Sequence, residues 1–281
     1  MNDQRIYFQE KDLTGIPEFF PRAVFYGDGV FETMRWKESA PVFLNRHIDR
    51  ISRAASAVGI APPSPENITR EINNAVRQSG FSDCAVKVCV ISDAPPSPFF
   101  APLDGSHTII SVRQIKNGTE NKPVKLLLSD VWRTRPDSPL SAVKSLNYLE
   151  NVIAMREAAK KGFDDALLCS PDGNIAETTC RNIFWGSGRD LFTPPEDCGI
   201  LPGITRGVLM EKAADAGFSI AEPPVKPSTA ANAEFVFVTN SVSGINPVET
   251  MQYQGLTHKF STSTHPSYVE VKTLLFQAFK W

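Results

Sequence analysis

Residues 142–152 read AVKSLNYLENV, residues 173–185 read GNIAETTCRNIFW, and residues 200–207 read ILPGITRG. The first stretch supplies an amine at Lys144 and the second supplies a carboxylate at Glu177. The third has the pattern of a helix start, where backbone N–H groups are available to bind an anion. Together they predict a site that holds a phosphate-bearing ligand through three chemically different contacts.

Lys144 and Glu177 both have neighbours that favour partial burial. Lys144 follows two small or apolar residues at the end of an expected strand and directly precedes an expected helix. A lysine in such a cleft loses its proton more easily, through desolvation or a nearby cation, whereas the alternative is an ordinary solvated lysine. Glu177 is flanked by apolar residues, so its carboxylate needs a cationic partner to stay ionised. Either a ligand or Arg181 could be that partner.

The segment LPGITRG places Gly203 and Thr205 at the start of an expected helix. The N–H groups there lie at the positive end of the helix dipole and suit a phosphate, with the threonine hydroxyl as an extra donor. The alternative interpretation is a threonine that simply caps an amphipathic helix.

These motifs closely resemble those of the fold-type IV (class IV) aminotransferases, a family that includes branched-chain and D-amino-acid aminotransferases and 4-amino-4-deoxychorismate lyase. KSLNYLENV is similar to the family's imine-lysine segment, ETTCRNIFW to its glutamate-containing strand, and PGITR to its phosphate cup. The resemblance extends from FYGDGVFETMR to GINPVETM. It implies pyridoxal 5'-phosphate as cofactor, joined to Lys144, with Glu177 at the ring nitrogen and Ile204 and Thr205 at the phosphate.

The same resemblance implies three more cofactor-binding residues. Arg50, in HIDRI, matches the arginine of the family's HxxRL motif and would supply a permanent positive charge to the phosphate. Ser241, in VTNSVSGINPV, matches a short hydroxyl residue of the phosphate site, and Tyr148 could hydrogen-bond the cofactor's phenolic oxygen. A solvated helix arginine and a turn serine are the alternatives for the first two. Arg181 is not part of the common pattern and has no assigned role.

The chain should form two domains of mixed α and β structure, α+β or α/β. The resemblance implies the D-amino-acid aminotransferase-like fold-type IV architecture, with the cofactor at the domain interface. We expect an N-terminal domain at 1–116, a polar linker at 117–123 and a cofactor-binding domain at 124–281. Residues 23–36 are expected to form a turn followed by a strand. Helices are expected at 47–59, 66–80, 146–162 and 202–217, and further strands at 6–8, 85–92, 107–115, 124–132, 165–170, 174–179, 181–186 and 233–240.

Bulk composition excludes several classes of function. The 281 residues include 29 basic and 31 acidic side chains for a formal net charge of -2, so no excess positive charge attracts nucleic acid or an anionic membrane. The N-terminus lacks a signal-peptide pattern and no apolar run is long enough to span a bilayer, which favours a cytoplasmic location. Five scattered cysteines argue against both disulfides and a metal site, and we interpret them as buried small residues.

The substrate is less clearly indicated. Residues 90–102 read VISDAPPSPFFAP and lack the arginine and histidine of the D-amino-acid branch and the glycine–arginine motif frequent in the lyase branch. By analogy with the branched-chain branch, Arg35 in FETMR is a candidate for binding a substrate carboxylate, with Arg22 and Arg113 as weaker ones. A plain amine substrate would need no such residue.

Three functions remain open from the sequence. The first is an aminotransferase that passes an amino group from an amino acid or amine to a 2-oxo acid. The second is 4-amino-4-deoxychorismate lyase, which releases pyruvate and 4-aminobenzoate, and the third is a non-catalytic protein that only binds the cofactor. The family resemblance also implies a homodimer.

Overall fold

The computed structural model describes residues 4–8, 11–12, 21–37, 40–93, 105–116 and 121–280. The chain divides into two compact units. The first unit comprises Met1–Lys116 together with Val143–Asn147, and the second comprises Asn117–Ala142 together with Tyr148–Trp281. Part of the expected linker, residues 117–120, lies outside the described residues, as does most of the atypical loop at 94–104.

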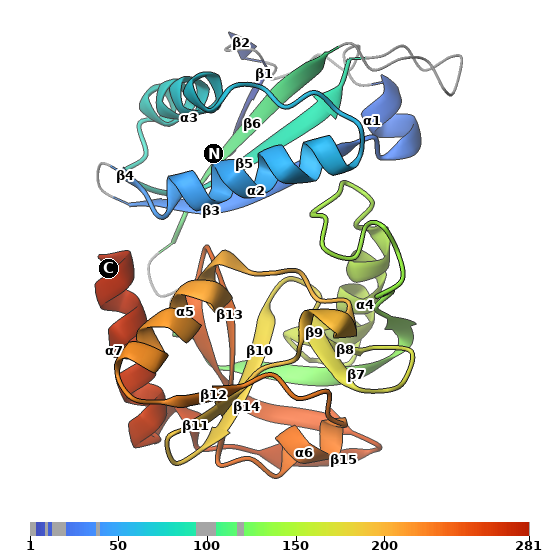
Figure 1. Cartoon of the computed structure of the whole chain (residues 1–281), viewed down its shortest axis with the longest axis vertical. Helices are drawn as coiled ribbons and strands as arrows, with labels where there is room; N and C mark the ends of the chain where they lie inside the picture. Colours follow the sequence, from blue (N-terminus) through green and yellow to red (C-terminus); the bar gives the residue numbers. More distant parts are fainter. Residues whose placement is uncertain are drawn as a thin grey trace. The chain divides into compact units, whose positions relative to one another are not determined.

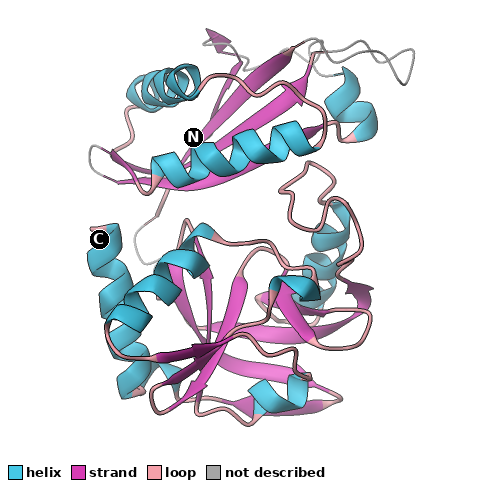
Figure 2. Cartoon of the chain, viewed as in Figure 1, coloured by secondary structure: helices cyan, strands magenta, loops and turns pink. Residues whose placement is uncertain are grey.

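The first unit is an antiparallel sheet with helices packed on it (Figures 1 and 2). The strands follow the order β2-β1-β6-β5-β3-β4 across the sheet. Their bounds are β1 Gln4–Phe8, β2 Lys11–Asp12, β3 Gly29–Lys37, β4 Ala40–Pro41, β5 Asp83–Ser92 and β6 Ser106–Gln114. The helices are α1 Pro21–Tyr26, α2 Leu44–Ala57 and α3 Pro65–Ser79.

One face of this sheet carries the core of the first unit. Alternate residues of β3, β5 and β6 point to the same side, as the two-residue period of a strand requires. On that side they pack with apolar residues that recur at helical spacing on α2 and α3. Helix α3 begins at the side-chain cap of Ser64 and ends at Gly80, whose φ of 70° permits the left-handed turn.

The second unit is a sheet that closes on itself, with helices around it. The strands run in the order β12-β11-β10-β13-β14-β7-β8-β9, and β9 pairs in turn with β10, which closes the ring; β15 extends β14. The strand bounds are β7 Val124–Arg133, β8 Asp165–Cys169, β9 Ile175–Thr178, β10 Asn182–Ser187, β11 Asp190–Phe192, β12 Ser219–Ala221, β13 Phe235–Asn240, β14 Gly244–Tyr253 and β15 Leu256–Lys259.

The helices of the second unit are α4 Leu149–Lys160, α5 Ile204–Asp215, α6 Pro227–Ala231 and α7 Pro266–Phe279, with short 3-10 turns at Glu196–Cys198 and Thr262–Thr264. Side chains from β7, β8, β10, β13 and β14 form its main apolar core. The mixture of sheet and helix in both units confirms the predicted α+β architecture.

Three local predictions were wrong. Residues 21–26 form helix α1 instead of a turn, although the following strand is present. Helix α4 begins at Leu149 and not at residue 146, because the backbone at 144–146 hydrogen-bonds to β3 instead. Cys180 is exposed, whereas Cys84, Cys169 and Cys198 are buried as expected and Cys89 is half-buried.

Two features are absent from the described part of the chain. No helix there has both the length and the apolar character to cross a membrane. Within the same residues, no group of three or more histidine, cysteine or acidic side chains is arranged to hold a metal ion.

Candidate functional site

In the second unit, Glu177 lies on β9 opposite Asn182 of β10. The amide Nδ2 of Asn182 donates to Glu177 Oε2 at 3.0 Å and to the carbonyl oxygen of Leu201 at 2.9 Å. The half-buried carboxylate of Glu177 thus accepts from a neutral side-chain donor, and the ion pair of Arg181 is with Asp165. Asn182 is the asparagine of the quoted RNIFW motif, yet the sequence analysis gave it no role.

The same asparagine also contacts the start of helix α5. Gly203 is the residue before the first helical turn, and no described side chain caps it. A Cβ atom at Gly203 would lie only 1.9 Å from Asn182 Oδ1, so this position requires glycine for close approach and not for its φ of -68°. Asn182 therefore connects the predicted ring-nitrogen carboxylate to the predicted phosphate cup.

Thr205 and Ser241 bring two hydroxyl groups together at that cup. Ile204 and Thr205 open α5 and are buried, and Thr205 Oγ1 lies 3.2 Å from Ser241 Oγ. Ser241 belongs to the turn between β13 and β14, so 36 residues of sequence separate the two hydroxyls. A helix N-terminus beside two hydroxyl groups is a suitable environment for a phosphate.

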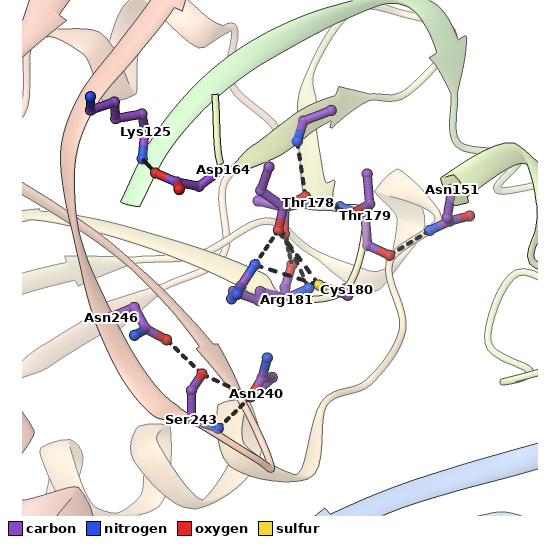
Figure 3. A network of polar contacts seen from close by, with 12 residues as sticks. Lys125, Asn151, Asp164, Thr178, Thr179, Cys180, Arg181, Asn240, Ser243 and Asn246 are labelled. Carbon is purple, nitrogen blue, oxygen red and sulfur yellow. Dashed lines mark hydrogen bonds and ion pairs between the residues drawn. The ribbon is translucent and has the colours of Figure 1, made fainter. Parts of the chain in front are cut away.

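The turn that carries Ser241 is fixed by side chains of neighbouring residues (Figure 3). Asn240 Oδ1 accepts hydrogen bonds from the backbone N–H groups of Val242 at 3.0 Å and Ser243 at 2.8 Å. Ser243 Oγ in turn lies 2.6 Å from Asn246 Oδ1 on β14. An asparagine that binds the backbone two or three residues further on is typical of a rigid turn.

Tyr148 is placed by the turn that follows Glu177. Its hydroxyl donates to the carbonyl oxygen of Thr179 at 2.7 Å, and Asn151 Nδ2 donates to the same oxygen at 2.8 Å. Because Tyr148 gives its proton to Thr179 here, a bond from it to a cofactor oxygen would require that hydroxyl to change partners.

A buried carboxylate, Asp165, binds the side chains and backbone of this turn. It accepts from the hydroxyls of Thr178 at 2.8 Å and Thr179 at 2.6 Å, and from the backbone N–H of Thr179 at 3.2 Å. Arg181 Nη1 completes the set with an ion pair at 2.5 Å. The structure thus gives Arg181 a partner in Asp165. Asp165 lies on β8 and Arg181 in the turn between β9 and β10, so no local sequence signal connected them.

Lys144 belongs to the first unit, as part of the segment Val143–Asn147. Its carbonyl oxygen accepts from the N–H of Phe31 at 2.8 Å, and the N–H of Leu146 donates to the carbonyl oxygen of Gly29 at 2.9 Å. The short segment thereby adds to the free edge of β3. The half-buried Lys144 side chain places Nζ 4.3 Å from the centre of the Phe31 ring.

Arg50 takes part in a buried charge cluster of the first unit. Its Nε and Nη2 donate to the two oxygens of Glu32 at 2.5 and 2.8 Å, and His47 Nδ1 lies 2.7 Å from Glu32 Oε2. Burial alone would raise the pKa of Glu32, but the hydrogen bonds from Arg50 and His47 outweigh it and lower that pKa to about 2. Glu32 uses two of the five N–H groups of the guanidinium.

The substrate-binding candidates of the first unit also have acidic partners. Arg35 is buried and binds both oxygens of Asp83, at 2.8 Å and 2.5 Å. Arg22 binds Asp28 at 2.6 Å, and Arg113 is exposed on β6. The pair with Asp83 indicates a structural role for Arg35, so carboxylate binding by this residue stays a prediction.

The predicted site residues therefore fall into two sets. Lys144, Arg50 and Arg35 belong to the first unit, whereas Tyr148, Glu177, Ile204, Thr205 and Ser241 belong to the second. Within the second unit, contacts through Asn182 and the Thr205–Ser241 pair connect most of them. Glu32, Asp165 and Asn182 are the structural partners that sequence reasoning missed.

Comparison with known proteins agrees with these features. The family model for amino-transferase class IV matches residues 29–251. The aminodeoxychorismate lyase of Bacillus subtilis is 30% identical over 256 residues, covering 88% of this chain and 86% of the relative. The branched-chain-amino-acid aminotransferase of Pseudomonas aeruginosa is 26% identical over 233 residues, covering 79% of this chain and 76% of the relative.

A solved structure shows the same fold. The branched-chain amino acid aminotransferase from Escherichia coli superposes with a TM-score of 0.84 at 20% identity and covers 99% of this chain and 94% of that one. This likeness confirms the predicted fold-type IV architecture. With the family match over most of its length, the chain belongs to the class IV aminotransferase family of enzymes.

Proposed function

We propose that the protein is a pyridoxal 5'-phosphate-dependent aminotransferase that transfers an amino group from an amino acid or amine to a 2-oxo acid. The observation that carries the proposal is the connected set around Asn182. It links the Glu177 carboxylate to the start of α5, where the hydroxyls of Thr205 and Ser241 lie together.

The described residues fit this cofactor chemically. A half-buried carboxylate suits a protonated ring nitrogen, because the two charges compensate each other away from water. The N-terminus of α5 with its two hydroxyls suits a phosphate. Arg50 adds a permanent positive charge, and Glu32 fixes the direction of its guanidinium.

When bound, the cofactor would supply an aldehyde and a ring that withdraws electrons from a substrate Cα. Lys144 would hold the group through its Nζ amine, and the same Nζ, when free, would act as the general base and acid that moves a proton at the substrate Cα. Glu177 would hold the ring nitrogen as a carboxylate that compensates a positive charge there.

The second candidate is an aminodeoxychorismate lyase. It is favoured by the Bacillus subtilis relative with that name, which is 30% identical over most of both chains. The same lysine, carboxylate and phosphate site would serve this reaction, so these residues do not separate the two candidates. The products separate the two candidates. The lyase releases pyruvate and 4-aminobenzoate, whereas the aminotransferase passes the amino group to a 2-oxo acid.

Absorbance spectroscopy tests the cofactor first. The purified protein loaded with pyridoxal 5'-phosphate should show the visible band of a lysine-bound cofactor, which a suitable amino donor shifts and Lys144→Ala abolishes. A protein that binds no chromophore would overturn the proposal.

Product analysis then tests the reaction. A panel of amino donors with a 2-oxo acid acceptor should yield the new amino acid, and aminodeoxychorismate alone should yield no 4-aminobenzoate. The opposite pattern would establish the lyase. A bound chromophore with neither product under any donor would indicate the non-catalytic cofactor-binding protein. We further expect a homodimer, as in the family, which light scattering on the eluting protein would show.

A further inference from the structure

Two lysine side chains of the first unit share one aromatic ring. Lys144 Nζ lies 4.3 Å from the centre of the Phe31 ring, and Lys87 Nζ lies 4.1 Å from the same centre. Since both distances are measured to a single point, the two nitrogens are no more than 8.4 Å apart, the sum of 4.3 and 4.1 Å. Lys87 is exposed on β5, and its role is not explained by the proposed site.

The sheet register explains why the two lysines meet there. Phe31 on β3 pairs with Cys89 on β5, so Lys87, two residues from Cys89, lies diagonally across from Phe31 on the same face. The bridge between Val30 and Ser145 places Lys144 next to Phe31 on the edge of β3, again on that face. The core with α2 and α3 occupies the opposite face.

Other charged or titratable groups near this face have partners or lie further along it. Asp83 pairs with Arg35, and Arg22 and Asp28 pair with each other beside helix α1. By register, the remaining groups on this face of β3, β5 and β6 are Lys37, Cys89, His107 and Arg113, and α1 adds Tyr26. Cys89 stays a neutral thiol, since burial raises its pKa and the opposing effect of Lys87 is smaller. No carboxylate is recorded in contact with Lys87 among the residues that the structure describes.

Two of the effects on the amine of Lys144, those of the Phe31 ring and of Lys87, oppose each other. The ring of Phe31 attracts an ammonium and so favours the charged form of Lys144. The ammonium of Lys87 repels a second positive charge and so favours the neutral form. In a variant without Lys87, the Phe31 ring stays in place. The difference in Lys144 ionisation between that variant and the wild type therefore measures the repulsion between the two lysines.

We propose that Lys87 is a positioning residue for the reaction, whose charge keeps a larger fraction of Lys144 in the neutral, nucleophilic state. A neutral amine is the form that bonds to an aldehyde and that accepts a proton from carbon. The proposal rests on the proposed role of Lys144. It adds to that role a second lysine that makes no covalent bond and acts only through its charge.

The test measures the ionisation of Lys144 in the full-length chain freed of cofactor. The rate at which acetic anhydride modifies Lys144 is followed against pH by mass spectrometry of the Lys144 peptide. In Lys87→Met, the midpoint should move upward by about half to one pH unit. Lys87→Arg keeps the charge and should leave the midpoint unchanged.

Lys125→Met is the matched control, because it removes one positive charge from another exposed strand lysine, in the second unit. It should not move the midpoint. An unchanged midpoint in both Lys87→Met and Lys87→Gln would overturn the proposal, as would an equal shift in Lys125→Met. The result does not depend on whether the chain is an aminotransferase, since it needs neither cofactor nor turnover.

A second readout uses the cofactor-loaded protein. Absorbance of the bound cofactor followed against pH should show its transition moving upward in Lys87→Met and staying in place in Lys87→Arg. If the loaded protein shows no chromophore, the proposed function fails, while the labelling result on Lys87 still stands.

Discussion

Among the residues that the structure describes, each unit buries one carboxylate, and the two carboxylates are neutralised in different ways. In the first unit, Glu32 accepts from the guanidinium of Arg50 and the ring of His47, so side chains surround it. In the second unit, Asp165 accepts from threonine hydroxyls, a backbone N–H and Arg181. Glu32 therefore orients a single arginine side chain, whereas Asp165 orients a length of backbone.

This difference matches what each unit contributes to the proposed site. The first unit holds charged groups that must point in a given direction, namely Arg50 and Lys144. The second unit holds turns and a helix start, which must keep their backbone shape to present Glu177, Thr205 and Ser241. Substitutions in the two units should thus have different consequences.

The largest effect is expected from Lys144→Ala. Because the variant loses the amine that we propose bonds to the cofactor and moves the proton, kcat/KM should fall by at least about 1000-fold. The backbone bonds of residues 144–146 to β3 remain, so the melting temperature should stay within a few degrees of the wild type. Steady-state kinetics and circular dichroism check the two halves of this prediction. Residual activity above a tenth of the wild type would contradict it.

Arg181→Met should cause the largest loss of stability. It leaves the fully buried Asp165 without its cationic partner, and breaking a buried pair in this way costs about 3 to 5 kcal/mol. Urea unfolding measures the change in the free energy of unfolding.

The control for this variant is Lys212→Met, which breaks the exposed pair with Asp215 at 3.2 Å. That substitution should change stability by less than about 1 kcal/mol. Equal effects of the two substitutions would show that Asp165 does not depend on Arg181. Restoration of stability by Asp165→Asn in the Arg181→Met background would support the buried-charge explanation.

The ionisation of Glu32 should make the stability of the folded chain depend on pH. Its folded pKa of about 2 lies below the unfolded value of 4.5, so the ionised carboxylate stabilises the folded chain above pH 4.5. That contribution, about 3 kcal/mol, should be lost as the pH falls from 4.5 through 2. Comparing wild type with Glu32→Gln at pH 7 and at pH 3 tests this, because the difference should shrink at the lower pH. A difference that stays constant would contradict the assignment.

The smallest effect tests the backbone shape in the second unit. Gly203→Ala would place Cβ 1.9 Å from Asn182 Oδ1 and so displace the amide that holds Glu177. We expect cofactor affinity to fall about 10-fold, measured by fluorescence titration with pyridoxal 5'-phosphate, which corresponds to about 1.4 kcal/mol.

Gly207→Ala is the matched control on the same helix. A Cβ at Gly207 meets nothing within 4 Å, and alanine in a helix interior is more favourable than glycine by about 0.5 to 1 kcal/mol. The control should therefore keep its cofactor affinity and gain stability. If both variants lose affinity equally, the contact with Asn182 is not what matters.

Much of the architecture could be predicted because it follows local periodicity. The apolar spacing on α2 and α3, and the glycine that ends α3, are visible in a short window of sequence. The predicted start of α4 was wrong because residues 144–146 pair with β3, which is more than 100 positions away in the chain. Helix α1 was missed because six residues with aromatic and β-branched members favour a strand by propensity.

The candidate site was predictable in its motifs and not in its partners. The motifs named Lys144, Glu177 and Thr205, but Arg35 and Asp83 are 48 residues apart, and nothing local indicates that they pair. Asp165 likewise reaches Arg181 only because β8 and β9 are neighbours in the folded sheet. Long-range pairing of charges depends on register, which a single sequence does not reveal.

The most direct test of the central claim is to trap the cofactor on the protein. The full chain is incubated with pyridoxal 5'-phosphate, reduced with sodium borohydride, digested and analysed by mass spectrometry. The proposed function predicts one phosphopyridoxyl group, on Lys144, and none in the same position after Lys144→Ala. A stoichiometric modification at another lysine, or no modification at all, would contradict it.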